Sequence, residues 1–394
     1  MELKIERKRL YDACKKVLKS TGPKTSAPEL SGILIEADAD NKTLKLTGTD
    51  LTVTLMVKFK DVDISEAGTA VISAGTFTNM LGAMTAELAE ITVQNNSLKL
   101  KCGSSVFSMA TMDVDKYPNV NIAFPENTIC VSGLALLSKQ NISVISAANV
   151  NDNPSFQGVQ VNFSPGISTA MSSDGIRFMR SKGTGIADGV LDLFIPDRAL
   201  KLLCGVVKFC DELYIGQTNN NAIFMTNEFA FSTCLKNGDL NNIEKLMERV
   251  VPKYSAEVNS SELLRAVESA VLMTHNVDSC VNVTLTDASL VLSVDNENGE
   301  MIIEVDAEKS TDMAGLIFHY RPNFILDFLR SNTGLIMVEF SESGVMKLRS
   351  DVAEYIVSRR NPAIIKAKKA VKEMAEKVEK GTKTKKGKAA KNAA

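Results

Sequence analysis

The sequence offers few side chains whose types and spacing could catalyse a reaction. Its two histidines, His275 and His319, are far apart and have no second histidine or cysteine at a metal-ligand spacing. The carboxylates best suited to general-base chemistry are Asp50 in TGTDL and Asp174 in SSDGI. Each lies close to a glycine, in a setting where Asp commonly forms a turn by bonding its own backbone. Turn formation is therefore the favoured interpretation for both, and an enzyme that uses Asp50 or Asp174 is the alternative.

Motifs for cofactors and metals are also missing from the sequence. GTG at residues 183–185 lacks the third glycine of a dinucleotide-binding fingerprint, and no phosphate-binding GxxxxGK[ST] loop occurs. The seven cysteines are scattered without a CxxC pair, which favours reduced thiols in a cytosolic protein over disulfides or zinc. The first residues, MELKIERKRL, do not have the form of a signal peptide, and no apolar run is long enough to span a membrane. We expect a cytoplasmic binding protein that has no catalytic residue, no metal and no cofactor.

A strand that runs directly into a short helix is the unit from which the chain is built. In LFIPDRALKLLCGVV, residues 193–207, an apolar run ends at Ile195, and Pro196 with Asp197 favours the start of a helix. The same pattern recurs at five other strand ends: Ile5, Ile72, Val131, Val258 and Tyr320. An apolar residue stands five positions after each of the six ends: Leu10, Phe77, Leu136, Leu200, Leu263 and Ile325. The spacing predicts six similar half-repeats.

A second period, twice as long, groups the half-repeats in pairs. Turn residues recur at intervals of about 124 residues at Asp50, Asp174 and Asn296, and strand aromatics recur at Phe107, Phe231 and Tyr355. The fold class predicted is α+β, with three tandem similar domains that each consist of two β-α-β half-repeats. Their expected bounds are 1–125, 126–253 and 254–360, followed by a basic, Lys-rich C-terminal extension at 361–394 that is expected to be partly disordered.

Charge is distributed unevenly along the chain. The net charge is −2, but residues 361–394 carry +8, so the body carries −10. The fourteen residues after each of the six strand ends carry +7 in total. Mildly basic helices in an acidic body suggest one surface made for a polyanion, and simple solvation of the helix backs is the alternative. The basic residues of these segments include Arg7, Lys8, Lys15, Lys16, Arg198, Lys201, Lys208 and Arg321.

Strand-rich repeats leave sheet edges that must be covered or joined. The apolar strand VFSMATM, which includes Phe107 and Met109, would invite aggregation as a bare edge. Three domains in a row can hide such edges by pairing end to end with a second copy and closing a ring, and a covering loop or helix is the alternative. The extension carries weakly periodic apolar residues amid lysines, which suits either a solvated tail or a DNA tether.

Several motifs together resemble those of the bacterial sliding clamp family, the beta subunit of DNA polymerase III. They are LKLTGTDLTVTL, MSSDGIRFM, the strands of Phe107 and Phe231, RVVP at 249–252, and the final strand EYIV. The resemblance extends from residue 1 to about 360. It implies the DNA clamp fold, closed as a head-to-tail homodimeric ring of six domains whose helices face duplex DNA. The implied function is that of a non-catalytic processivity factor that tethers the polymerase, the clamp loader and repair factors through short peptide motifs.

The resemblance also assigns site residues. The partner-peptide pocket would comprise Phe156, Ser173, Gly175, Arg177, Phe178, Arg249, Val250, Ile356 and Ser358. The dimer contact would place Leu272 and Met273 against Phe107 and Met109, and Lys24 would match a DNA-contacting loop position. Ile176 stands where the family usually has histidine, and Ser358-Arg359-Arg360 replaces the usual apolar ending. A non-ring nucleic-acid-binding or structural scaffold built on the same repeats is the alternative function.

Overall fold

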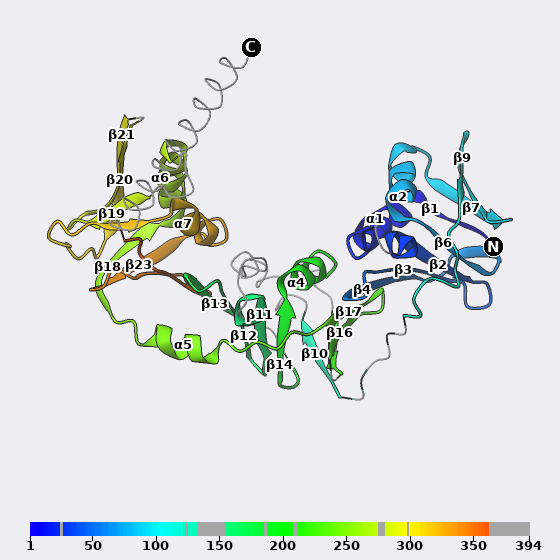
Figure 1. The fold of residues 1–394 in the computed structure, drawn as a ribbon, viewed down its shortest axis with the longest axis horizontal. Helices are drawn as coiled ribbons and strands as arrows, with labels where there is room; N and C mark the ends of the chain where they lie inside the picture. The colour runs from blue at the N-terminus through cyan, green and yellow to red at the C-terminus, as the bar shows by residue number, and fades with distance from the viewer. Residues whose placement is uncertain are drawn as a thin grey trace, which may run out of the picture. The chain divides into compact units, whose positions relative to one another are not determined.

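The structure, a computed structural model, forms two compact units (Figure 1). The first contains Met1–Asp174 with Arg180–Leu240, and the second contains Gly175–Met179 with Asn241–Ala394. The structure describes residues 1–23, 27–120, 122, 125, 127–132, 154–184, 187–207, 212–218, 220–274, 280–297 and 299–361. Both units combine helices with antiparallel sheets, so the predicted α+β class is confirmed. The two domains predicted at 1–125 and 126–253 lie largely in the first unit.

Each described half-repeat begins its helix two residues after the predicted strand end. The five pairs are β1 (Glu2–Glu6) with α1 (Arg7–Leu18), β6 (Gly68–Ser73) with α2 (Ala74–Ala83), β14 (Leu191–Pro196) with α4 (Asp197–Cys204), β18 (Pro252–Asn259) with α6 (Ser260–Met273), and β22 (Phe318–Tyr320) with α7 (Pro322–Leu329). The sixth strand, β10 (Thr128–Ser132), is also present, but the helix predicted around Leu136 lies outside the described residues. The repeat is thus confirmed in five of its six copies.

Local sequence explains where these helices begin and which side they bury. Pro322 occupies the first turn of α7, where its missing N–H costs nothing, and Asn259 caps α6 by accepting from the backbone N of Ser261 at 2.9 Å. The residue five positions after each strand end is at most 2% exposed in all five described copies: Leu10, Phe77, Leu200, Leu263 and Ile325. The apolar stripe of each helix therefore faces the core, and its polar side faces outward.

One eight-stranded sheet of the first unit crosses the predicted boundary at residue 125. Its order is β10, β15 (Glu212–Gln217), β16 (Asn221–Met225), β17 (Phe229–Cys234), β4 (Val53–Phe59), β3 (Thr43–Thr49), β2 (Gly32–Asp38) and β6. Phe231 of β17 lies opposite Leu55 of β4, so the first two repeats are joined edge to edge. A five-stranded sheet has the order β5 (Asp63–Glu66), β1, β7 (Leu88–Gln94), β8 (Ser97–Cys102) and β9 (Ser105–Ala110), with β9 at its edge.

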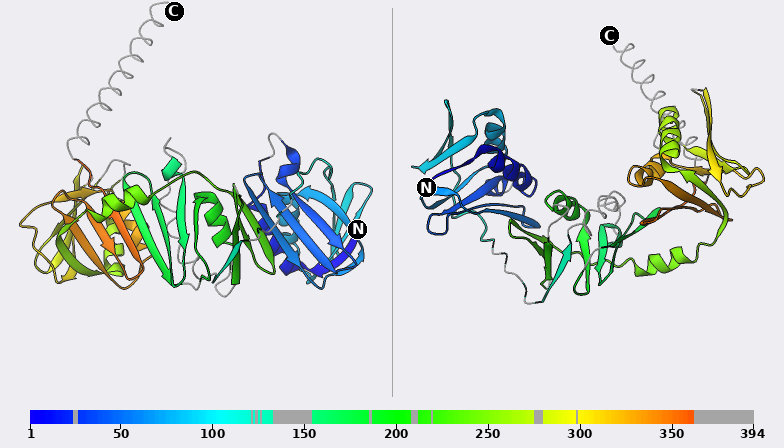
Figure 2. Two further views of the ribbon diagram at one scale, coloured as in Figure 1. Left: turned by 90° about the horizontal axis from the view of Figure 1, so that it is seen from below. Right: turned by 180° about the vertical axis from the view of Figure 1, so that it is seen from behind.

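The remaining strands complete the first unit and build the second. β11 (Gly158–Phe163), β12 (Ile167–Ser173) and β14 belong to the first unit, and β13 (Arg177–Thr184) begins in the segment assigned to the second. In the second unit the order is β25 (Ala353–Val357), β24 (Met346–Arg349), β23 (Leu335–Ser341), β18, β21 (Gly299–Glu308), β20 (Ser289–Asn296), β19 (Val281–Leu285) and β22. The helices pair within each unit, α1 beside α2 and α6 beside α7, as Figures 1 and 2 show. The short segments are η1 (Pro28–Ser31), η3 (Pro154–Phe156) and α5 (Asn241–Glu248).

The glycine of TGTDL allows α1 to pack directly on β3. A Cβ built on Gly48 would lie 2.7 Å from Cγ1 of Val17 and 2.8 Å from the carbonyl oxygen of Val17. The hydroxyl of Ser20 donates to the carbonyl oxygens of Val17 at 2.7 Å and of Gly48 at 3.1 Å. Any side chain at residue 48 would therefore push the end of α1 away from the sheet.

This contact predicts opposite results for two Gly→Ala changes. Gly48→Ala should lower the free energy of unfolding by about 1–3 kcal/mol, because overpacking forces the backbone to shift. Gly75→Ala is the matched control: a Cβ there meets nothing within 4 Å and lies in α2, so stability should stay level or rise by up to about 1 kcal/mol. Urea unfolding of the parent and both variants measures the change in the free energy of unfolding. Equal stability of the two variants would contradict this explanation of the motif.

Candidate functional site

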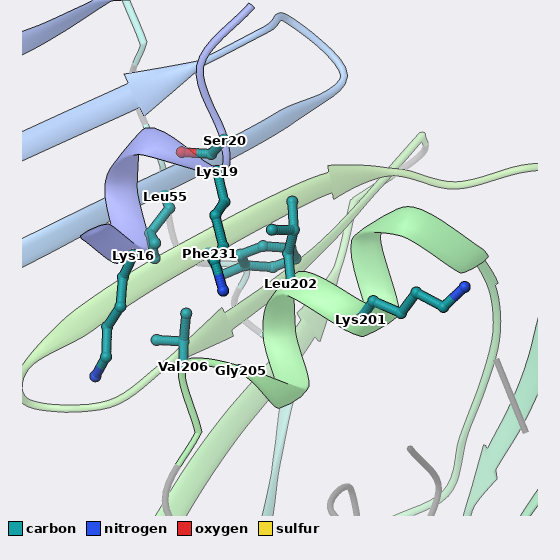
Figure 3. Close-up of a pocket in the computed structure, with 9 residues that line it drawn as sticks. All are labelled: Lys16, Lys19, Ser20, Leu55, Lys201, Leu202, Gly205, Val206 and Phe231. Atoms are coloured by element: carbon teal, nitrogen blue, oxygen red, sulfur yellow. The ribbon is translucent and has the colours of Figure 1, made fainter. Parts of the chain in front are cut away.

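Among the described residues, most of the predicted DNA-facing side chains lie on α1 and α4. Lys8, Lys15, Arg198 and Lys201 are exposed, and Lys16 is half-buried. In Figure 3, Lys16 of α1, Lys19 just after that helix and Lys201 of α4 line a small hollow together with apolar residues, and Lys16 and Lys201 point away from each other. The apolar lining consists of Leu55, Leu202, Val206 and Phe231. Lys24 and Lys208 lie outside the described residues.

All three arginines predicted to face DNA have structural contacts, and those of Arg7 and Arg321 lie within their own repeats. Arg7 donates from Nε to the carbonyl of Ala86 at 2.9 Å and from Nη1 to the carbonyl of Leu81 at 3.0 Å. These bonds tie α1 to the end of α2, whose last carbonyls lack helical partners. The guanidinium carbon of Arg321 lies 5.3 Å from the ring centroid of Phe324 on α7. Contact of Arg7 and Arg321 with DNA remains a prediction, and sequence reasoning missed both packing roles.

Asp50 forms a turn, as predicted, and also links two half-repeats. Its Oδ1 accepts from the backbone N of Thr52 at 2.9 Å, the hydroxyl of Thr52 at 2.7 Å and the backbone N of Val53 at 2.8 Å. Its Oδ2 accepts from Nη1 of Arg198 at the start of α4, and Nη2 of Arg198 donates to the carbonyl of Lys19 at 3.3 Å. Partial burial opposes ionisation, but the bonds from Arg198, Thr52 and Val53 outweigh it and lower the pKa of Asp50. This carboxylate is a structural anion.

The predicted partner-pocket residues have very different exposures. In the first unit, Phe156 is half-buried and Ser173 is buried. In the second unit, Arg177, Phe178 and Ile356 are buried, at 8%, 3% and 4% exposure. Gly175, at φ +83°, Arg249 and Ser358 are exposed, and Val250 is half-buried. A pocket formed by all nine residues remains a prediction.

Arg177 is held by α7 within the second unit. Its Nη1 donates to Oδ2 of Asp327, and its guanidinium carbon lies 4.1 Å from the ring centroid of Phe324. The backbone N of Ser358 donates to the carbonyl of Ile176 at 3.1 Å, which fastens the end of the last repeat to the same segment. Truncating Arg177 or Ile356 would thus remove fold contacts as well as any contact with a ligand.

The second unit contains a groove that includes two of the predicted pocket residues. Arg249, Val250 and Val251 line one part of it, and the turn after β23 supplies Ser341, Glu342 and Ser343. The groove encloses about 440 Å³, and Val251 is 75% exposed. Nζ of Lys253 donates to Oε1 of Glu342 at 2.7 Å, which lowers the pKa of Glu342 and raises that of Lys253. The family motifs did not include this Ser-Glu-Ser turn, although its polar residues between two apolar strands were visible in the sequence.

The predicted dimer residues lie on exposed apolar surfaces of the two units. Phe107 is 37% exposed on the edge strand β9, where Met109 is half-buried. Leu272 is 74% exposed near the end of α6, and Met273 is half-buried. The core thus does not require Leu272, which leaves it available to the predicted dimer contact.

Two further properties concern only the described part of the chain. There, no three His, Cys, Asp or Glu side chains gather in a way that could hold a metal ion. No helix in that part is long and apolar enough to cross a membrane.

Comparison with known proteins identifies the fold. Residues 1–121 match the family described as DNA polymerase III beta subunit, N-terminal domain. A solved DNA polymerase sliding clamp from Bacillus subtilis superposes with a TM-score of 0.81 at 21% identity, over 92% of this chain and 99% of that one. The chain has the sliding clamp fold. A curated Bacillus subtilis beta sliding clamp is 23% identical over 88% of this chain and 94% of its own. The resemblance inferred from the motifs is therefore confirmed. A griselimycin-bound sliding clamp from Pseudomonas aeruginosa also has a TM-score of 0.81, at 18% identity, over 92% of this chain and 99% of that one.

The geometry at Asp50 predicts a pH-dependent loss of stability. Asp50→Asn should cost about 1–2 kcal/mol at pH 7, because it weakens charge-assisted bonds to a poorly exposed group. The folded-state pKa is lowered, so the contribution is present above the unfolded pKa of about 3.9 and is lost as the pH falls through the folded pKa. The difference in the free energy of unfolding between the parent and Asp50→Asn should therefore become smaller below about pH 4.

Asp38→Asn is the control, because Asp38 is also a turn carboxylate, and it accepts hydrogen bonds from the backbone N and Nδ2 of nearby Asn41. Denaturant unfolding between pH 3 and pH 7 follows both variants. If Asp50→Asn lowers the free energy of unfolding no more than Asp38→Asn does, the stabilising role of the Arg198–Asp50 ion pair is contradicted.

Proposed function

We propose that this protein is a DNA sliding clamp, a ring-shaped and non-catalytic processivity factor of the replicative polymerase in the cytoplasm. The observation that carries the proposal is the clamp fold itself, which covers 92% of the chain and 99% of a solved Bacillus subtilis clamp. The repeated helices support it, because all five described copies begin at the same place in their repeat. The expected domains are 1–125, 126–253 and 254–360, with the basic extension at 361–394.

Ring closure by two copies is supported by the edges of the two units. β9 ends the five-stranded sheet and carries exposed apolar residues, Val106 and Phe107. In the second unit, β21 pairs with β18 only through Ala307 and Glu308 in the described pairings, and Ile302 on the rest of the strand is exposed. Unpaired apolar edges are unfavourable in an isolated chain, and a head-to-tail dimer would pair them. Leu272 and Met273 would then contact Phe107 and Met109.

Duplex DNA is the ligand proposed for the helix surface. The exposed cations on α1 and α4 are held on rigid helices, so they can attract phosphates without reading base sequence. A closed ring needs few direct contacts, because it is retained by topology. The clamp loader, the polymerase catalytic subunit and repair factors are the proposed protein partners.

Short peptides from these partners are proposed to bind near Arg249 and Val250. The groove there combines exposed valine surface with an arginine and a polar turn, which suits an apolar segment fixed by a few polar contacts. The solved Pseudomonas aeruginosa clamp is a griselimycin complex, so a protein of this fold does bind a ligand.

Topological binding gives the first test. The loaded protein should stay on a nicked DNA circle and dissociate when the circle is linearised, because the ring can then slide off an end.

Leu272→Glu with Met273→Glu should give a folded monomer that is not retained on circles, since it places charge on the proposed dimer contact. Leu335→Glu is the control, because Leu335, like Leu272, is an exposed leucine of the second unit, and its exposed fraction is 60%. Size-exclusion mass and retention are measured together. Equal retention on circular and linear DNA would contradict the ring.

Peptide binding gives the second test. Arg249→Ala with Val251→Ser should weaken binding of a polymerase C-terminal peptide at least about tenfold, the equivalent of about 1.4 kcal/mol. Both side chains are exposed, so the melting temperature should stay within about 2 °C of the parent. Arg330→Ala with Val352→Ser is the control, since both of these residues are exposed elsewhere in the second unit. Fluorescence anisotropy of the labelled peptide measures affinity. Unchanged affinity in the first variant would place the peptide site elsewhere.

A further inference from the structure

The C-terminal extension leaves the fold at a fixed point. The backbone N of Ser358 donates to the carbonyl of Ile176 at 3.1 Å, and the backbone N of Arg360 donates to the carbonyl of His319 at 2.7 Å. Between them, the guanidinium carbon of Arg359 lies 5.9 Å from the ring centroid of Phe318. Three successive residues are therefore held by β22 and by the segment Gly175–Met179 of the second unit.

This exit point lies beside the groove of Arg249, Val250, Val251, Ser341, Glu342 and Ser343. A Cβ on Gly344 would lie 2.7 Å from Cδ of Arg359, so the arginine stem packs against the residue that follows the groove turn. The backbone N of Gly344 donates to the carbonyl of Ser341 at 3.0 Å, which closes that turn. Five residues beyond Asn361 can extend about 17 Å. Residues 362–366 are thus long enough to enter the groove directly.

The chemistry of residues 362–366 matches the groove. Their sequence is PAIIK, four apolar residues followed by a lysine, and they precede an extension dominated by lysine. The groove offers the exposed side chain of Val251 and the half-buried side chain of Val250, followed by the carboxylate of Glu342. That carboxylate is ionised at neutral pH like any exposed Glu, and the bond from Lys253 to its Oε1 lowers its pKa further. Ile364 and Ile365 can cover the valines while Lys366 meets the other carboxylate oxygen of Glu342, beside Lys253.

This chain also contains residues that have no counterpart in a solved clamp. The structural match covers 99% of the Bacillus subtilis clamp but 92% of this chain, so this chain has residues without a counterpart there. A groove occupant supplied by the extension would therefore be a property of this chain and not of the fold.

We propose that residues 362–366 occupy the groove in cis and compete with partner peptides for it. The competition rests on the proposed function, whereas the contact between the segment and the groove does not. A segment tethered so close has an effective concentration on the order of millimolar, so even a weak intrinsic affinity fills the groove for most of the time. Partners that bind elsewhere on the clamp, or that capture the extension, would open the groove.

Disulfide trapping in the full chain tests the contact without any partner. Val251→Cys with Ile364→Cys should form an intrachain disulfide on mild oxidation at least about tenfold faster than Val352→Cys with Ile364→Cys. Val352 is 54% exposed and lies in the turn before β25, at the opposite end of that strand from the exit point. The exposed Cys234 is replaced by Ser in both variants, and peptide mass spectrometry measures the bond. Equal rates, or no bond at residue 251, would overturn the proposal.

Peptide affinity separates this proposal from the proposed function. Ile364→Ser with Ile365→Ser should tighten binding of the polymerase C-terminal peptide about tenfold relative to the parent. Val371→Ser with Met374→Ser, farther along the extension, should leave it unchanged. Equal affinity for all three proteins would overturn the competition while leaving the peptide site intact. Fast trapping at residue 251 in a protein that binds no peptide would support the cis contact and overturn the peptide site of the proposed function.

Discussion

The requirement that each helix pack over the end of its own strand determines most of this structure. The helix begins two positions after the predicted strand end, so it must fold back over the sheet, and the residue five positions after that end is driven into the core. Burying one stripe of each helix leaves its opposite side in solvent. Lys8, Lys15 and Lys201 lie on such outer sides because the core positions are taken by apolar residues. The basic surface is thus a consequence of the packing, and it is supported by rigid elements.

Backbone pairing at sheet edges sets how the repeats are joined. Between the first two repeats, β4 and β17 satisfy each other's backbone hydrogen-bonding groups. The ion pair of Asp50 with Arg198 adds a side-chain link between the same repeats. The carboxylate can be partly buried there because its own turn and the arginine together supply its hydrogen bonds. The strands that remain at an edge, β9 and much of β21, keep apolar side chains exposed. One physical demand thus explains both the internal joint and the surfaces proposed for a second copy.

The sequence predicted what depends on neighbouring residues and missed what depends on distant ones. The helix starts and the inward residues such as Leu10 and Leu200 were predictable, because strand ends, helix-start signals and apolar spacing are local. The turn at Asp50 was predictable for the same reason. The partners of Arg198, Arg7 and Arg177 were not, since each contact joins residues far apart in the chain. The pocket residues were assigned only through family resemblance, which does not indicate which of them are buried.

That difference in exposure divides the proposed peptide site into two layers. Arg177, Phe178 and Ile356 are packed by their own chain, and Arg177 is already committed to Asp327 and Phe324. Arg249 and Val251 are exposed, so they can meet a ligand without loss of core packing. In the proposed site, the buried residues therefore serve the fold, and the exposed residues are the ones available to a ligand. In this chain the exposed layer lies next to Arg359 and the start of the extension, where most of the chain's excess positive charge begins. A ligand that enters the groove would accordingly compete with the cis segment proposed above.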